Sequence, residues 1–126
     1  MLKICHNIQY RGKKVQIKAT EYNIRIIILE MDGRLDAFNS PKLRTSLEEY
    51  REQGVIRFIL NLSHLEFMDS AGMAVLVTHL KHVRQENGEV RLVLPASEAA
   101  RRILRLTRFD RIFDCYETIE EARQSF

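Results

Sequence analysis

Residues 55–81, VIRFILNLSHLEFMDSAGMAVLVTHLK, contain the clearest change of hydrophobic pattern in the chain. Six of the first eight residues are apolar and several are β-branched, which predicts a strand buried on both faces. A polar loop follows, and the apolar spacing then becomes that of a helix with one buried face, from about Ser70 to Asn87. A strand that leads into a helix indicates a right-handed crossover unit and a parallel sheet.

The residues before this stretch predict two strands and a helix. Alternation from Lys14 to Ala19 is typical of a strand with one solvated face, and polar Thr20 to Asn23 then predicts a turn. The apolar run Ile24 to Met31 predicts a buried strand in the middle of the sheet. Ser40 is expected to cap a helix that extends from about Pro41 to Gln53.

The residues after residue 87 continue the alternation of strands and helices. Val90 to Leu94 predicts a strand, and Ser97 is placed to cap the helix that follows. A short strand near Ile112 to Tyr116 precedes a terminal helix, which Thr118 caps with Glu121 three residues later. We therefore predict an α/β domain with a mixed, mostly parallel sheet, an N-terminal antiparallel hairpin at its edge and about four helices.

Composition limits the size and the location of the protein. With 126 residues, 45% of them apolar, the chain is long enough for one domain, which we expect over residues 14–126 after an arm or extra strand at residues 1–13. Cys5 and Cys115 lack a CxxC partner and indicate reduced thiols. No apolar run approaches the roughly 20 residues that span a bilayer, and no signal peptide is evident. We expect a cytoplasmic protein without membrane insertion.

The charge pattern argues against direct nucleic-acid binding. The formal net charge is only +3, and the two signs are interspersed along the chain. The densest basic stretch, Arg101 to Arg108, contains Ile103, Leu104 and Leu106 at helical spacing. It therefore predicts a solvated helix with one buried side rather than a nucleic-acid patch.

Function in an open α/β sheet is concentrated in the loops at the carboxyl ends of the strands, here Asp32 to Ser40 and Ser63 to Ser70. In the second loop, Asp69 and Ser70 begin a helix, and the simplest interpretation is an N-cap. A phosphate on Ser70 would also meet the positive end of the helix dipole and the free N–H groups of the first turn. Gly72 either permits close packing or leaves the backbone accessible to a partner.

Three segments together resemble the STAS domain of bacterial anti-sigma factor antagonists: GRLDAFNSPKLR, FILNLSHLEFMDSAGMAVLVTHLK, and Asn87-Gly88 before a strand. The resemblance covers about residues 14–124. It implies that Ser70, in the D-S-x-G motif, is the phosphoacceptor and that Asp36 engages a partner kinase. Ala71 stands where many members have a second serine. The resemblance implies a set of partner-contact residues: Asp36, Asn39, Ser40, Asp69, Ser70, Ala71 and Gly72.

The same resemblance implies the mechanism and the partners. Unmodified protein would bind an anti-sigma factor that is a serine/threonine kinase and so release a sigma factor. Phosphorylation of Ser70 would weaken this complex, and a metal-dependent serine/threonine phosphatase would restore it. We expect no cofactor, no metal and no catalytic activity. The sequence leaves open whether the protein forms a weak homodimer.

The sequence allows three alternatives to a phosphorylated anti-sigma factor antagonist. An accessory STAS subunit of a transporter or signalling assembly would keep the fold without sigma factor control. A hydrolase using Ser70 or Asp36 as nucleophile is disfavoured, because the glycine before the serine of a nucleophile elbow is replaced by Met68. The spacing of His79 and His82 on one helix is compatible with a shared metal, but no third ligand is evident, so we expect both on a solvated helix face.

Overall fold

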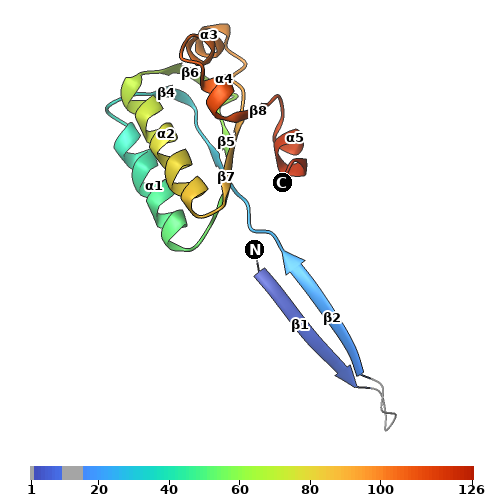
Figure 1. The fold of residues 1–126 in the computed structure, drawn as a ribbon. Coiled ribbons are helices and arrows are strands. Elements are labelled where there is room, and N and C mark those ends of the chain that lie inside the picture. The colour runs from blue at the N-terminus through green and yellow to red at the C-terminus, as the bar shows by residue number, and fades with distance from the viewer. Residues whose placement is uncertain (1, 10–15) are drawn as a thin grey trace.

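The computed structural model describes residues 2–9 and 16–126, with side chains from Ile24 onward (Figure 1). The strands are β1 (Leu2–Gln9), β2 (Gln16–Asn23), β3 (Ile27–Glu30), β4 (Gly33–Leu35), β5 (Arg57–Asn61), β6 (Leu65–Met68), β7 (Glu89–Val93) and β8 (Asp114–Tyr116). The helices are α1 (Ser40–Glu52), α2 (Ser70–Gln85), α3 (Glu98–Leu106), α4 (Phe109–Ile112) and α5 (Ile119–Gln124).

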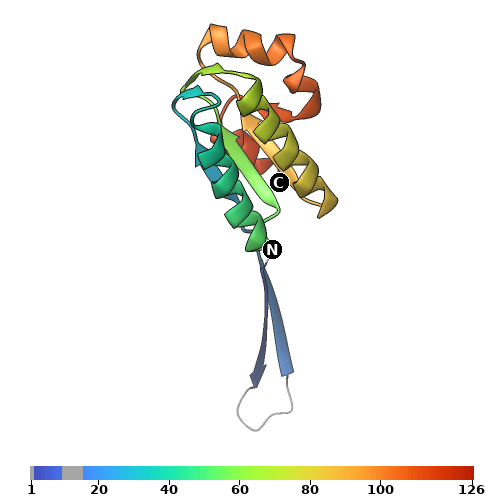
Figure 2. The ribbon, with the colours of Figure 1, turned by 90° about the vertical axis from the view of Figure 1, so that its left-hand side faces the viewer.

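A four-stranded parallel sheet in the order β3-β5-β7-β8 forms the centre of the domain. Side chains of successive strand residues point to opposite faces. Phe58 and Leu60 of β5 pack against α1 and α2, whereas Ile59 packs against α5 on the other face (Figures 1 and 2). The predicted α/β class with mostly parallel strands is confirmed.

The N-terminal hairpin is antiparallel, but it is not the hairpin that the sequence predicted. Strand β1 pairs with β2 along its whole length, in a two-stranded sheet separate from the central one. Thr20 to Asn23 therefore belongs to a strand and not to a turn, because threonine and tyrosine favour strands and no glycine or proline interrupts the segment. Lys14 and Val15, and the predicted domain boundary between residues 13 and 14, lie outside the described residues.

The prediction that Ile24 to Met31 forms a central strand buried on both faces is wrong. The part of this segment that forms a strand, β3, is the edge strand of the sheet, and exposure alternates along it. Ile28 is 39% exposed and Ile24 is 47% exposed, whereas Ile59 on the neighbouring strand is fully buried. Apolar composition alone cannot distinguish these cases, because the order of strands in the sheet depends on pairing between distant segments.

Both loops expected at the carboxyl ends of strands contain a short strand. Strands β4 and β6 lie in these segments and pair with each other in parallel. The Arg34 guanidinium lies over the Phe67 ring, with 4.2 Å between the guanidinium carbon and the ring centroid, which ties the two strands together. The two candidate loops are therefore held side by side.

Three of the predicted helix caps are confirmed, and one is wrong. Ser97 and Thr118 accept hydrogen bonds from backbone N–H groups at the starts of α3 and α5, as predicted. Gly54 follows α1 in the left-handed conformation. The N-cap of α1 is Asn39 and not Ser40, which is the first helical residue and is buried.

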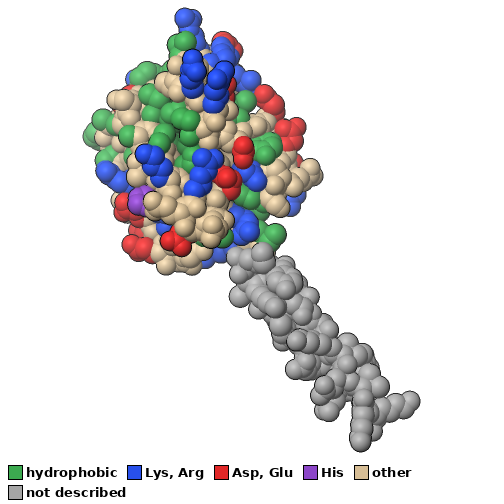
Figure 3. Space-filling model, viewed as in Figure 1, with side chains coloured by type: hydrophobic (Ala, Val, Ile, Leu, Met, Phe, Trp, Pro, Cys, Tyr) green, Lys and Arg blue, Asp and Glu red, His purple; other side chains and the backbone are tan. Residues whose placement is uncertain are grey.

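The basic stretch at the C-terminal side forms part of α3, with Ala100 and Leu104 buried beneath it. Basic side chains gather over this end of the domain in Figure 3. Arg101 forms an ion pair with Glu117, and Arg105 forms one with Glu98.

Among the described residues, no helix has both the length and the apolar content to cross a membrane.

The edge position of β3 predicts unequal effects of two matched substitutions. Ile28 and Ile59 are paired in register on neighbouring strands and point to the same face. Ile59→Ala should lower the free energy of unfolding by about 2–5 kcal/mol, the usual cost of such a core truncation. Ile28→Ala should cost clearly less, because its side chain is already partly exposed. Denaturant unfolding of both variants measures this, and equal losses would contradict the edge assignment.

Candidate functional site

The site is built where β4 and β6 end beside each other. The backbone N–H of Asp69, just after β6, donates to the Leu35 carbonyl at the end of β4 (3.1 Å). This bond continues the pairing of the two strands by one residue. The segment before α1 and the start of α2 are thereby brought together, although they are more than thirty residues apart in the sequence.

The Asp69 carboxylate connects these two segments. Its Oδ1 accepts hydrogen bonds from the N–H groups of Ala71 (2.9 Å) and Gly72 (3.0 Å), which caps α2. Its Oδ2 accepts one from the N–H of Ala37 (3.0 Å), in the turn before α1. The Gly72 bond, with those from Ala37 and Ala71 and the charge of Arg34, lowers the pKa of Asp69 below its ordinary value.

This arrangement changes the interpretation of Ser70. Asp69 is the N-cap of α2, and Ser70 is the first helical residue. The N–H groups of Ala71 and Gly72, which the sequence offered to a phosphate, are already occupied by Asp69. The Ser70 side chain is exposed, and its hydroxyl makes no hydrogen bond to any residue that the structure describes. The hydroxyl is therefore accessible and has no structural use.

Gly72 is explained by packing. It is buried, and a Cβ at this position would lie 2.7 Å from the Leu35 Cγ and 2.8 Å from the Leu35 carbonyl oxygen. A side chain at residue 72 would push α2 away from β4. Of the two roles that the sequence left open, close packing is the one the geometry accounts for. Ala71 is half-buried beside Ser70.

The segment before α1 is a turn fixed by its own side chains. Asp36 Oδ1 accepts hydrogen bonds from the N–H groups of Phe38 (3.0 Å) and Asn39 (3.2 Å). Asn39 Oδ1 accepts one from the Asp36 N–H (2.8 Å), and its side-chain amide donates to the Arg34 carbonyl. The Ser40 N–H donates to the Asp36 carbonyl (2.8 Å). Asp36 and Asn39 therefore shape the loop, whatever else they contact.

Sequence reasoning missed Phe38, which lies at the tip of this turn and is 89% exposed. A signal was available, because Asp36 and Asn39 are typical turn residues and the two residues between them are expected to be exposed. An exposed aromatic side chain in the turn that is hydrogen-bonded to Asp69, the residue before Ser70, makes this end of the domain suitable for contact with another protein.

The expectation that His79 lies on a solvated helix face is wrong. His79 is 1% exposed, and its ring stands perpendicular to that of Phe58 with centroids 4.4 Å apart. Burial, together with the charges of Arg51 and His82, lowers the pKa of His79 to about 3. Its spacing from Leu76 and Val83 places it in the buried stripe of α2.

The described residues contain no group of three or more His, Cys, Asp or Glu side chains that could hold a metal ion. Cys115 is half-buried, and burial raises the pKa of its thiol to about 11. A thiol of this kind is a poor nucleophile at neutral pH. No base is hydrogen-bonded to the Ser70 hydroxyl within the described part of the chain, so the site lacks the pairing that activates a serine nucleophile.

Comparison with known proteins identifies the family. The model of the STAS domain family matches residues 17–122, which is most of the chain. The chain belongs to the STAS domain family. A Thermotoga maritima protein named "putative anti-sigma factor antagonist" is 38% identical over 100 residues, 79% of this STAS domain chain and 88% of the relative. The anti-sigma-B factor antagonist of Listeria monocytogenes is 30% identical over 76 residues, 60% of this chain and 67% of the relative.

Solved structures share the fold of this STAS domain. The crystal structure of a Thermotoga maritima protein with the same description has a TM-score of 0.74 at 32% identity, over 83% of this chain and 92% of the other. SpoIIAA of Bacillus, solved in its phosphorylated form, has a TM-score of 0.64 at 23% identity, over 83% and 94% of the two chains. At that identity the SpoIIAA likeness shows the fold alone.

The Asp69 bridge in this STAS domain predicts a local effect of one substitution. In Asp69→Asn, the amide oxygen can still cap α2, but the Nδ2 group cannot accept the Ala37 N–H. Amide exchange at Ala37 should therefore accelerate, while Gly72 stays protected. In the wild type the same loosening should appear only as the pH falls below 3.8 and through the lowered pKa of Asp69.

NMR-detected hydrogen exchange measures both effects. Asp32→Asn is the matched control, because Asp32 is an exposed carboxylate with no hydrogen bond to the Ala37 turn. Unchanged exchange at Ala37 in Asp69→Asn would show that Asp69 does not hold the turn.

Proposed function

We propose that this STAS domain is an anti-sigma factor antagonist that is switched off by phosphorylation of Ser70. The observation that supports the proposal is that Asp69, and not Ser70, caps α2. Because Asp69 caps the helix, the Ser70 hydroxyl stays exposed and unbonded on a surface whose backbone is fixed. The antagonist names of the Thermotoga and Listeria relatives support the assignment.

The unmodified protein binds an anti-sigma factor that is a serine/threonine kinase, and the bound anti-sigma factor releases its sigma factor. The contact surface comprises the turn from Asp36 to Asn39 together with Asp69, Ser70 and Ala71. Ser40 and Gly72 are buried and hold this surface in place from beneath. The domain contributes a phosphoacceptor and no catalytic group of its own, and it requires no cofactor.

A phosphate on Ser70 acts on binding and hardly on folding. It brings about −1.5 to −2 charges next to the Asp69 carboxylate. The helix dipole offsets part of the repulsion, but the first-turn N–H groups that could stabilise a phosphate are already used by Asp69. In the free protein the group stays in water, whereas in a complex it would have to be desolvated against a surface shaped for a hydroxyl. A metal-dependent serine/threonine phosphatase would reverse the change.

Substitutions at Ser70 should separate the two states of the switch. Ser70→Ala should bind the anti-sigma kinase persistently in the presence of ATP, because it cannot be phosphorylated. Ser70→Asp should bind at least tenfold more weakly, since one carboxylate reproduces part of the phosphate charge. Calorimetric titration with the purified kinase measures both affinities.

Mass spectrometry after incubation with the kinase and ATP should place the phosphate on Ser70. Ser40 is buried and the Ser97 hydroxyl is used as a helix cap, so both serve as internal controls. A phosphate on either of them, or equal affinities for Ser70→Ala and Ser70→Asp, would overturn the proposal. Binding to a transporter or signalling protein instead of an anti-sigma factor would favour an accessory STAS subunit.

A further inference from the structure

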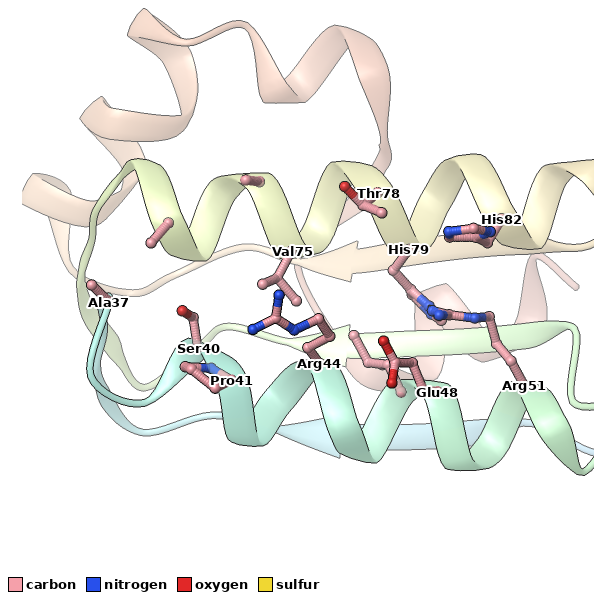
Figure 4. Close-up of a pocket in the computed structure, with 13 residues that line it drawn as sticks. Ala37, Ser40, Pro41, Arg44, Glu48, Arg51, Val75, Thr78, His79 and His82 are labelled. Atoms are coloured by element: carbon pink, nitrogen blue, oxygen red, sulfur yellow. The ribbon is translucent and has the colours of Figure 1, made fainter.

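A groove of about 380 Å³ extends from the Ser70 site along the contact between α1 and α2. Ala37 and Ala71 line one end of it, next to Ser70. Figure 4 shows Arg44 and Arg51 extending from α1 toward α2, with His82 on the opposite wall. The groove is therefore continuous with the surface that carries the phosphoacceptor.

The charges along this groove are mostly positive. Arg44 and Arg51 are cationic, and Glu48 is the acidic side chain in the lining. Arg51 Nη1 donates to His79 Nδ1 at 2.6 Å, so His79 is the acceptor and holds the guanidinium in place. Because the buried His79 is neutral, it orients Arg51 without cancelling its charge.

Phe38 lies in the turn between Ala37 and Ser40, two residues that line the groove, although its own side chain is not part of the lining. It is the most exposed of the large apolar side chains with a described environment. Its backbone is held on both sides, because the N–H groups of Ala37, Phe38 and Asn39 all donate to the carboxylates of Asp36 or Asp69. Because the backbone that carries it is already fixed, this exposed aromatic side chain loses only its own rotamer freedom when it enters a pocket, which is a property of a binding hot spot.

We propose that Phe38 and the α1–α2 groove form one docking surface, on which Phe38 enters an apolar pocket of the anti-sigma factor and the groove takes an acidic segment of it. This inference rests on the proposed function, since it names how the same partner is held. It assigns a role to Phe38 and Arg44, which are not among the partner-contact residues that the resemblance implies. It also predicts the complementary surface of the partner, which is an apolar pocket flanked by carboxylates.

The first test compares two exposed apolar side chains. Phe38→Ala should weaken binding to the purified anti-sigma factor about 30-fold, as expected for a hot-spot residue. Leu106→Ala is the matched control, because Leu106 is 72% exposed and lies on α3, a helix that contributes no residue to the groove. Its affinity should stay within twofold of the wild type, roughly the scatter of a neutral contact. Equal affinities of Phe38→Ala and wild type would overturn the role of Phe38.

The second test reverses a charge. Arg44→Glu should weaken binding at least tenfold at low ionic strength and reduce its salt dependence, because it places a carboxylate opposite the acidic segment. Lys81→Glu is the control, since Lys81 is an exposed cation on α2 that does not line the groove. An equal loss in both variants would indicate a general charge effect and contradict the groove.

The two proposals fail in different ways. If the wild type binds the anti-sigma factor and Ser70 phosphorylation abolishes binding, the proposed function stands. If Phe38→Ala and Arg44→Glu then bind as the wild type does, this inference alone is wrong. If the wild type does not bind the anti-sigma factor at all, the proposed function fails, and the docking surface fails with it.

Discussion

The structure of the site depends on one carboxylate shared between two segments. Asp69 uses one oxygen to cap α2 and the other to hold the turn before α1. A capping side chain normally serves a single helix end, and its second oxygen faces solvent. Here that second oxygen turns a helix cap into a link between two loops. The shape of the candidate binding surface follows from this link.

The parallel pair β4–β6 makes the shared carboxylate possible. It brings Leu35 next to Asp69, and the absence of a side chain at Gly72 lets α2 approach the same strand. A helix start, a strand end and a turn thus meet within a few ångströms. Because Asp69 supplies the cap, the Ser70 hydroxyl is not needed to cap α2. A modifiable hydroxyl at this position can change charge without removing a bond that the fold requires.

Much of the fold could be predicted from the sequence, since periodicity and helix ends depend on local chemistry. The α/β class, the caps at Ser97 and Thr118 and the left-handed Gly54 are of this kind. The edge position of β3 and the hairpin partner of β2 depend on pairing between distant segments, which an apolar pattern does not encode. Asp69 and Ser70 are both good capping residues, so only the geometry shows which one caps. The spacing of His79 from Leu76 and Val83 indicates the buried face of α2, but a polar side chain at that position favoured the prediction of a solvated face.

The central claim is that phosphorylation changes what the surface binds and leaves the domain itself intact. The most direct measurement takes the unmodified and the Ser70-phosphorylated protein from one preparation. It determines for each the affinity for the anti-sigma factor and the free energy of unfolding. The account predicts a loss of affinity of at least a hundredfold, about 2.7 kcal/mol, with unfolding free energies that agree within about 1 kcal/mol. A phosphoprotein that binds as well as the unmodified form, or that loses binding only because it unfolds, would contradict it.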